Sequence, residues 1–366
     1  MPVQQILLAV GGAPVTKVQD VFSVDLWTGD GSSTDIDNDI KLSGEGGMVW
    51  IKNRDRQTPN PNVYTYNHLI FDTVRGNTKY IIPSITFNID PSEQTSSSMI
   101  TSFNSDGYSV GSDNSVNQNG DDIVGWTFRK HPKFFDIATA TVASDASVGT
   151  TITHSLESDL GMAVIKSRTN PASQGYNWLV WHKQSTATAN QYFTFNEDNG
   201  RQQQNNTMTY DSSSKTFTFG YPAADMGDRM RPGTGSNSDL VGYFFAHNDG
   251  DGEFGPDGDQ DIIKTGTYTG NGSTTGTVVT VGFEPQFVII KHLNPSTYNG
   301  WYMFDTTRGV QTGSTDAVLR VNWNNAESSS NLIKFTSTGF QLEAQGAEVN
   351  QNGHTYIYIA IRKDDA

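Results

Sequence analysis

Short apolar runs separated by polar turns follow one another along the whole chain, and two of these runs occur three times each. The first is a four-residue apolar run that ends in lysine, and its copies are Met48–Lys52, Met162–Lys166 and Phe287–Lys291. The second is a mixed aromatic and aliphatic run, and its copies are Trp126–Lys130, Tyr243–His247 and Ile359–Lys363. Copies of the first run are 114 and 125 residues apart, and copies of the second are 117 and 116 residues apart. Two markers with nearly the same period indicate three diverged copies of one module.

The same pattern predicts β-strands. Met48–Ile51 is apolar at every position, which is typical of a central strand covered on both faces. Thr355–Arg362 alternates between side-chain types, as expected of a strand with a buried face. Turns rich in Gly, Asn, Asp and Ser divide these short runs. Since two packed sheets bury both kinds of strand, we predict an all-β chain of three tandem β-sandwich modules of the jelly-roll or lectin-like type.

The repeat markers also place the domain boundaries to within a few residues. We predict an N-terminal anchoring arm over residues 1–20 and β-sandwich modules over residues 21–133, 134–250 and 262–366. An acidic, Gly-rich linker over residues 251–261 joins the second module to the third.

Charge and composition narrow the range of partners. The formal net charge is −15, and a surface this acidic repels phosphate backbones and anionic lipid, so we expect neither nucleic-acid binding nor membrane insertion. The chain has no cysteine, which excludes a disulfide framework, a thiolate metal site and a cysteine nucleophile.

The N-terminal segment contains one apolar run, Ile6–Val10, with no basic residue before it. This run is too short for the core of a signal peptide, so we expect synthesis in the cytoplasm without a cleaved signal. We interpret it either as a short edge strand or as an anchor in which Ile6, Leu7 and Leu8 pack on a neighbouring subunit.

Carboxylates alternate with glycines around the predicted linker. The candidate metal ligands there are Asp249, Asp251, Asp257, Asp259 and Asp261. Calcium requires several oxygen ligands on a flexible loop, and this spacing can supply them, although it differs from the EF-hand pattern. The alternative interpretation is a solvated linker whose Asp-Gly pairs mark turns. We expect no other cofactor.

A second polar motif, Asp-Thr-x-Arg-Gly, occurs at Asp72–Gly76 and again at Asp305–Gly309. A carboxylate three residues before an arginine can form a charge-assisted pair that fixes a turn. The middle module lacks the motif, and a catalytic group would not be needed twice, so we predict a structural corner.

The sequence contains neither the HExxH zinc motif nor a P-loop. A glycosidase needs two carboxylates across a sugar cleft. Asp72 with Glu45 and Asp305 with Glu284 are conceivable pairs, but nothing in the sequence selects them. We therefore predict that the protein is not an enzyme.

Aromatic residues beside polar turns are the better candidates for ligand binding. Trp301, Trp323, Tyr298 and Tyr64 are near turns rich in Asn, Gln and Asp. Sugar rings stack on aromatic faces while amide and carboxylate groups bind their hydroxyls, so we predict glycan binding at these residues. The alternative interpretation places each ring in a sandwich core.

Several segments, taken in order, resemble one family. They are Val21–Gly29, Gly44–Arg54, Ile123–Lys130, Phe134–Asp136, Phe254–Asp259, Gly282–Phe287 and Tyr356–Arg362. The chain resembles a family of repeated modules that is abundant in marine bacteriophage genomes, whose members are described as tail-fibre or virion proteins with a concanavalin-A-like jelly-roll fold. The likeness extends from about Val21 to Lys363.

The resemblance implies a virion structural protein located in the phage particle. The leading expectation is a tail-associated fibre or tip protein that attaches to host surface glycans, since linked weak sites multiply avidity. The alternative is a capsid or tail decoration or connector protein, and a polysaccharide depolymerase ranks third. The implied partners are other virion proteins, copies of the same chain and host surface polysaccharide.

Overall fold

The computed structural model describes residues 16–56, 66–84, 93–142, 150–169, 178–185, 191–203, 208–219, 238–293, 300–310 and 316–364. The predicted anchor residues Ile6, Leu7 and Leu8 and the predicted glycan ligands Tyr64 and Tyr298 lie outside these residues.

The first module contains nine strands and three single helical turns. Its strands are β1 (Phe22–Thr28), β2 (Thr34–Asp37), β3 (Gly47–Asn53), β4 (Leu69–Asp72), β5 (Lys79–Ile81), β6 (Gln94–Thr95), β7 (Ile100–Phe103), β8 (Gly107–Val110) and β9 (Asp122–Arg129). The helical turns are η1 (Val18–Asp20), α1 (Leu42–Glu45) and α2 (Asn114–Asn117).

The second and third modules repeat the nine strands. The second contains β10 (Phe135–Val142), β11 (Thr150–Thr153), β12 (Asp159–Ser167), β13 (Leu179–His182), β14 (Gln191–Thr194), β15 (Gln202–Gln203), β16 (Met208–Asp211), β17 (Thr216–Phe219) and β18 (Ser238–His247). The third contains β19 (Ile263–Thr269), β20 (Val278–Thr280), β21 (Pro285–His292), β22 (Trp301–Asp305), β23 (Asp316–Arg320), β24 (Ser328–Ser330), β25 (Ile333–Thr336), β26 (Gly339–Leu342) and β27 (Thr355–Arg362).

Each module folds into a six-stranded sheet packed on a three-stranded sheet. In the first module the strand orders are β1-β9-β3-β4-β5-β6 and β2-β8-β7. The second module has the orders β10-β18-β12-β13-β14-β15 and β11-β17-β16, and the third has β19-β27-β21-β22-β23-β24 and β20-β26-β25. All of the paired strands are antiparallel. The predicted all-β class with three tandem sandwich modules is confirmed.

The register of the paired strands identifies equivalent residues in the three modules. One such position lies opposite the start of the central strand and is occupied by Asp72, His182 and Asp305. Another lies in the closing strand and is occupied by Trp126, Tyr243 and Ile359.

The central strand of each module is buried on both faces, as the apolar run in the sequence predicted. In β3, Val49 and Ile51 point into a core that the first module's two sheets enclose. Met48 and Trp50 point to the other face and join a larger core. Since side chains alternate along a strand, one short apolar run contributes to two cores.

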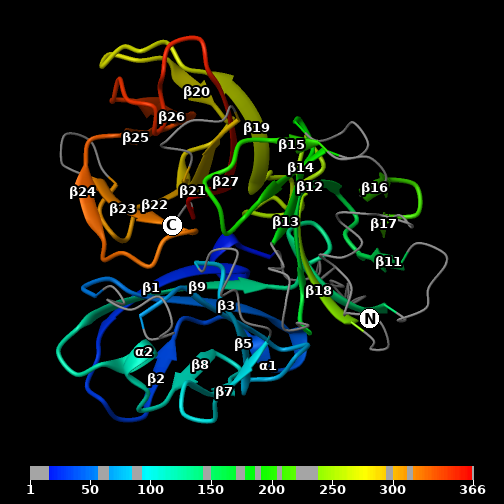
Figure 1. Cartoon of the computed structure of the whole chain (residues 1–366), viewed down its shortest axis with the longest axis vertical. Helices are drawn as coiled ribbons and strands as arrows, with labels where there is room; N and C mark the ends of the chain where they lie inside the picture. Colours follow the sequence, from blue (N-terminus) through cyan, green and yellow to red (C-terminus); the bar gives the residue numbers. More distant parts are fainter. Residues whose placement is uncertain are drawn as a thin grey trace, which may run out of the picture.

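This larger core, which we call the central core, is shared by all three modules. It includes Trp50 and Phe128 of the first module, Phe245 of the second, and Phe287 and Ile361 of the third. The modules are arranged around a common centre, each with its six-stranded sheet turned inward (Figure 1). Burial of each large apolar side chain contributes roughly 1.5–3 kcal/mol, so the central core binds the three modules into one body.

The segment between the second and third modules takes part in this core. Phe254 is fully buried there and forms a bridge with Thr16, and the ring of His131 lies 4.7 Å from its ring. The predicted linker is therefore packed against the modules rather than wholly solvated.

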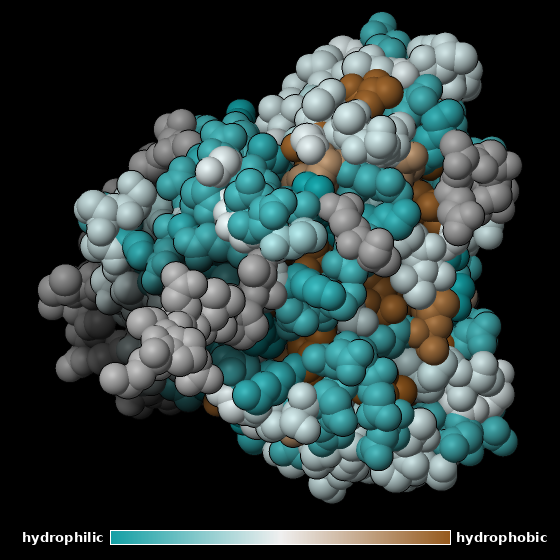
Figure 2. All heavy atoms as spheres, turned by 180° about the vertical axis from the view of Figure 1, so that it is seen from behind, coloured by the Kyte–Doolittle hydropathy of each residue, from teal (hydrophilic) through white to brown (hydrophobic). Residues whose placement is uncertain are grey.

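The face of the molecule seen in Figure 2 is mainly hydrophilic, with smaller hydrophobic areas between the polar ones. Leu26, Val74 and Val278 are the large hydrophobic residues that are exposed within the described part of the chain. None of the helices in that part is long and apolar enough to cross a membrane.

Candidate functional site

The Asp-Thr-x-Arg-Gly motif forms the structural corner that the sequence predicted. Asp72 ends β4, and its Oδ1 accepts a hydrogen bond from the backbone N–H of Arg75 at 2.8 Å. The Nε of Arg75 donates to Oδ2 of Asp72 at 2.5 Å, and both side chains are fully buried. Gly76 follows with a φ of +91°, a conformation that glycine adopts without strain.

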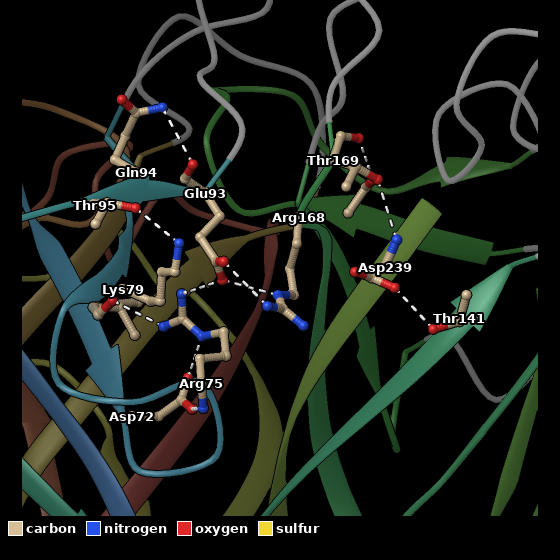
Figure 3. Close-up of polar contacts among 12 residues, drawn as sticks. Asp72, Arg75, Lys79, Glu93, Gln94, Thr95, Thr141, Arg168, Thr169 and Asp239 are labelled. Carbon is tan, nitrogen blue, oxygen red and sulfur yellow. Dashed lines mark hydrogen bonds and ion pairs between the residues drawn. The ribbon is translucent and has the colours of Figure 1, made fainter. Parts of the chain in front are cut away.

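This corner also binds the second module. Arg75 Nη2 donates to the hydroxyl of Tyr243 at 3.0 Å, and that hydroxyl donates to Asp72 Oδ2 at 2.8 Å. Arg75 Nη1 lies 3.3 Å from Glu93, whose carboxylate accepts two hydrogen bonds from Arg168 at 2.8 and 3.1 Å (Figure 3). Asp72, Arg75 and Glu93 thus form one surface of the junction between the first two modules.

Burial and charge act in opposite directions at this corner. Burial by itself would lower the pKa of Arg75, but Tyr243, Asp72 and Glu93 outweigh it and keep the pKa above its ordinary value. Burial raises the pKa of Tyr243 well above its ordinary value, so its hydroxyl remains neutral and able to donate.

The third module repeats this corner against the first module. Arg308 donates to Asp305 from its backbone at 2.8 Å and from Nε at 2.6 Å, and Trp126 Nε1 donates to Asp305 Oδ2 at 3.0 Å. Glu327 accepts from Arg308 at 3.0 Å and from Arg54 at 2.6 Å. Sequence reasoning found the Asp and Arg of both corners but missed the glutamates and the arginines of the neighbouring modules.

Trp301 corrects one sequence-based prediction. It was a candidate for sugar stacking, but it is only 1% exposed and belongs to the central core. Its Nε1 donates to the carbonyl of Thr194 at 2.9 Å, and its ring packs on Phe195 at 5.1 Å. The ring therefore holds the second and third modules together and has no face available to a sugar.

Trp323 differs because it remains partly exposed. The guanidinium of Arg320 lies 4.1 Å from its ring centre, and its Nε1 donates to Asp198 Oδ1 at 3.3 Å. Asn322 Nδ2 donates to the same oxygen at 2.7 Å. We call Trp323, Arg320, Asp198 and Asn322 the Trp323 cluster.

The Trp323 cluster combines groups from two modules, since Asp198 belongs to the second module and the others to the third. An indole ring can stack on the C–H face of a sugar, while a guanidinium and a carboxylate can bind its hydroxyls. Because Arg320 covers part of the indole, a ligand would approach the remaining exposed part of the ring.

The acidic segment does not assemble into the predicted calcium site. Across the described ranges, no three acidic or histidine side chains are grouped so that they could hold a metal ion. Asp261 instead accepts hydrogen bonds from the backbone of Gly250 and Gly252. Three of the five candidates, Asp249, Asp251 and Asp261, also pair with lysines, at 3.4–3.7 Å. The alternating Asp-Gly pattern marks turns here, so Asp249, Asp251, Asp257, Asp259 and Asp261 are turn residues between β18 and β19 rather than a calcium site.

The lysine that ends each repeat marker is buried in all three modules. Lys52, Lys166 and Lys291 are at most 1% exposed. Burial lowers the pKa of Lys52 and of Lys291 to about 7, with nearby carboxylates offsetting part of this effect. Lys166 and Lys291 lie 6.0 and 5.6 Å from the ring centres of Trp178 and Trp301. Sequence reasoning noted these lysines as markers but did not predict their burial.

The arrangement as a whole defines a ring of three β-sandwich modules held by a common core and by buried ion pairs. The chain matches the family described as "Domain of unknown function (DUF7483)" over residues 17–364, and it belongs to that family. The matched range spans all three modules, so the family describes the whole ring rather than one module. No curated protein and no solved structure matches the chain.

Proposed function

We propose that this protein is a non-enzymatic structural component of a bacteriophage particle, and that it attaches the tail to glycans on the host surface through the Trp323 cluster. The observation that carries the attachment role is the partly exposed indole of Trp323 beside Asp198 and Arg320. The resemblance to phage virion modules supports the location in the particle.

A non-enzymatic role agrees with the state of the carboxylates that a glycosidase would need. Asp72 and Asp305 are fully buried in ion pairs with Arg75 and Arg308, so neither can reach a substrate. Of the other two carboxylates, Glu284 pairs with Lys363 at 2.8 Å. Glu45 pairs with Lys41 at 3.6 Å. Each of the four carboxylates is therefore already paired with a cation.

The rigidity of the ring supports attachment. Asp198 and Trp323 come from different modules, so the cluster exists only while the second and third modules are docked. Because the shared core fixes that docking, little conformational freedom is lost when a ligand binds.

The test is a glycan microarray followed by calorimetric titration of any bound glycan. Trp323→Ala removes the stacking ring, and a lost contact of about 1.4 kcal/mol corresponds to a tenfold loss of affinity. Trp27→Ala is the matched control, since Trp27 is a partly exposed indole in the first module whose Nε1 donates to the carbonyl of Val116. Equal affinities for the Trp323→Ala variant and the wild-type protein would overturn the attachment site.

A purely structural role as a decoration or connector protein on capsid or tail is the second candidate. It is favoured by the closed ring, in which the modules bury their apolar faces against one another. Immunogold labelling of purified particles separates the two candidates. Label at the tail tip supports attachment, whereas label along the capsid or between tail subunits supports a structural role.

A further inference from the structure

The ring closes through three junctions with the same backbone geometry. At each junction, the residue just before the last strand of a six-stranded sheet donates its backbone N–H to a backbone carbonyl of the next module. The three hydrogen bonds are Glu93 to Arg168 at 2.9 Å, Arg201 to Leu293 at 2.9 Å and Glu327 to Arg54 at 2.7 Å. The backbones are therefore equivalent at all three junctions, and only the side chains distinguish one junction from another.

Two of the junctions have an acidic corner that faces a donor surface. The corner of the first module contains Asp72 and Glu93 and faces Tyr243 and Arg168 of the second. The corner of the third module has Asp305 and Glu327, which face Trp126 and Arg54 of the first. In both, a hydroxyl or indole N–H donates to the aspartate, and an arginine pairs with the glutamate.

The third junction replaces every one of these groups. The corner of the second module has His182, Ser185 and Arg201 where the others have Asp, Arg and Glu. It faces Ile359 and Leu293 of the third module, which offer neither a hydrogen-bond donor nor a charge from their side chains. His182 reaches the carbonyl of Tyr358 at 3.1 Å, and Arg201 donates to the carbonyl of Ser185 at 2.9 Å.

We infer that these corner and facing residues form a recognition code that fixes which module docks on which. The partner of an acidic corner is a sandwich module with an aromatic donor and an arginine at the facing positions. The partner of the second module's corner, which has no carboxylate at these positions, is a module with isoleucine and leucine there. In a ring of three, each module contacts both of the others. The chain segments that connect the modules therefore do not by themselves determine the order in which the modules follow one another around the ring.

The code excludes the ring of opposite order. In that ring, the acidic corner of the first module would face Ile359 and Leu293. Asp72 and Glu93 would lose Tyr243 and Arg168, and Arg75 would have to balance both carboxylates. The corner of the second module would place Arg201 against Arg54, a like-charge contact. Two of three junctions would be mismatched, and an uncompensated buried charge is strongly destabilising.

Conversion of one junction into the other type tests the code in the full-length chain. The corner half is Asp72→His, Arg75→Ser and Glu93→Arg, and the facing half is Tyr243→Ile and Arg168→Leu. We expect each half alone to lower the urea concentration at the midpoint of unfolding. The variant with all five substitutions should recover most of that decrease. The coupling between halves should exceed tenfold in the unfolding equilibrium constant. Additive effects of the two halves would overturn the code.

A milder double-mutant cycle tests the code if the variant with all five substitutions does not fold. Glu93→Gln and Arg168→Gln, singly and together, remove the two charges without adding bulk and should show coupling of at least threefold. The exposed pair Lys363 and Glu284, exchanged to Met and Gln, is the matched control and should show almost none. Equal coupling in the Glu93–Arg168 and control pairs would show that the junction pairs carry no specificity.

Discussion

The hydroxyl of Tyr243 donates to the buried carboxylate of Asp72 at 2.8 Å across the boundary between the first two modules. The two residues are 171 positions apart in the chain. Each lies at the inner face of its own six-stranded sheet, so neither has this partner until the modules dock. The contact therefore reports on docking rather than on the folding of either module.

Tyr243→Phe should destabilise the protein by about 2 kcal/mol, because a hydrogen bond to a buried charge is lost while the ring remains. Urea unfolding followed by tryptophan fluorescence measures the change. Tyr268→Phe is the control, since Tyr268 donates to the neutral carbonyl of Val349 at 2.7 Å and should cost about 1 kcal/mol. Equal losses in both variants would contradict a charge-assisted bond.

Arg308→Met should cost about 3–5 kcal/mol, because it leaves Asp305 buried without its cationic partner. The measurement is the free energy of unfolding from denaturant titration. Lys363→Met, which breaks an exposed pair with Glu284, should change stability by about 0–1 kcal/mol. A small effect at Arg308 would mean that the corner adds little to ring closure.

Lys291→Met should stabilise the protein at neutral pH by about 1–4 kcal/mol, because burial of the charged ammonium costs more than its surroundings return. Its pKa in the folded state is about 7, below the ordinary 10.5. Between about pH 7 and pH 10.5, Lys291 is therefore protonated in the unfolded chain but not in the folded chain. The stability cost is fully present below pH 7 and fades as the pH rises toward 10.5.

Thermal unfolding at pH 6.5 and pH 10 measures this dependence. The gain in melting temperature of the Lys291→Met variant should be large at pH 6.5 and small at pH 10. A gain that is independent of pH would indicate a packing effect instead. Lys363→Met, at the exposed pair with Glu284, is the control.

Asp316→Asn should stabilise the protein at pH 7.5 but not at pH 4. Burial raises the pKa of Asp316 to about 6, although Oδ2 accepts hydrogen bonds from the backbone of Ile333 and Leu332. Because the pKa of Asp316 is raised in the folded state, the stability that this residue contributes is fully present below the ordinary carboxyl pKa of 3.8. It is lost as the pH rises through about 6.

The expected gain for Asp316→Asn is on the order of 1 kcal/mol at pH 7.5, after allowance for solvent screening. Differential scanning calorimetry at the two pH values measures it. Asp239→Asn is the control, an aspartate that accepts a hydrogen bond from Thr141 at an exposed site. A gain at pH 4 equal to that at pH 7.5 would contradict a titrating carboxyl at position 316.

The sequence predicted what is local or repeated and missed what depends on module docking. Internal repeats revealed three modules, and the Asp72 and Arg75 spacing revealed a corner. The ring was not predictable, because Tyr243 carries no local sign that it faces Asp72. Trp301 was misplaced for a related reason, since proximity to a polar turn does not show which face a ring occupies. The burial of Lys52 was within reach, because strand alternation puts it on the face of Met48 and Trp50.

The shared core also determines how long an apolar face stays exposed while the chain is being synthesised. The inner face of the first module, with Met48 and Trp50, is fully covered only when the third module has arrived, since Phe195 of the second module and Phe287 of the third both line this region. At about 5–20 residues per second, the ribosome completes the chain roughly 10–50 s after the first module has emerged. During that interval an apolar sheet face stays open beside neighbouring nascent chains. Chaperones, or sparse translation that keeps nascent chains apart, should therefore favour closed rings over entangled ones.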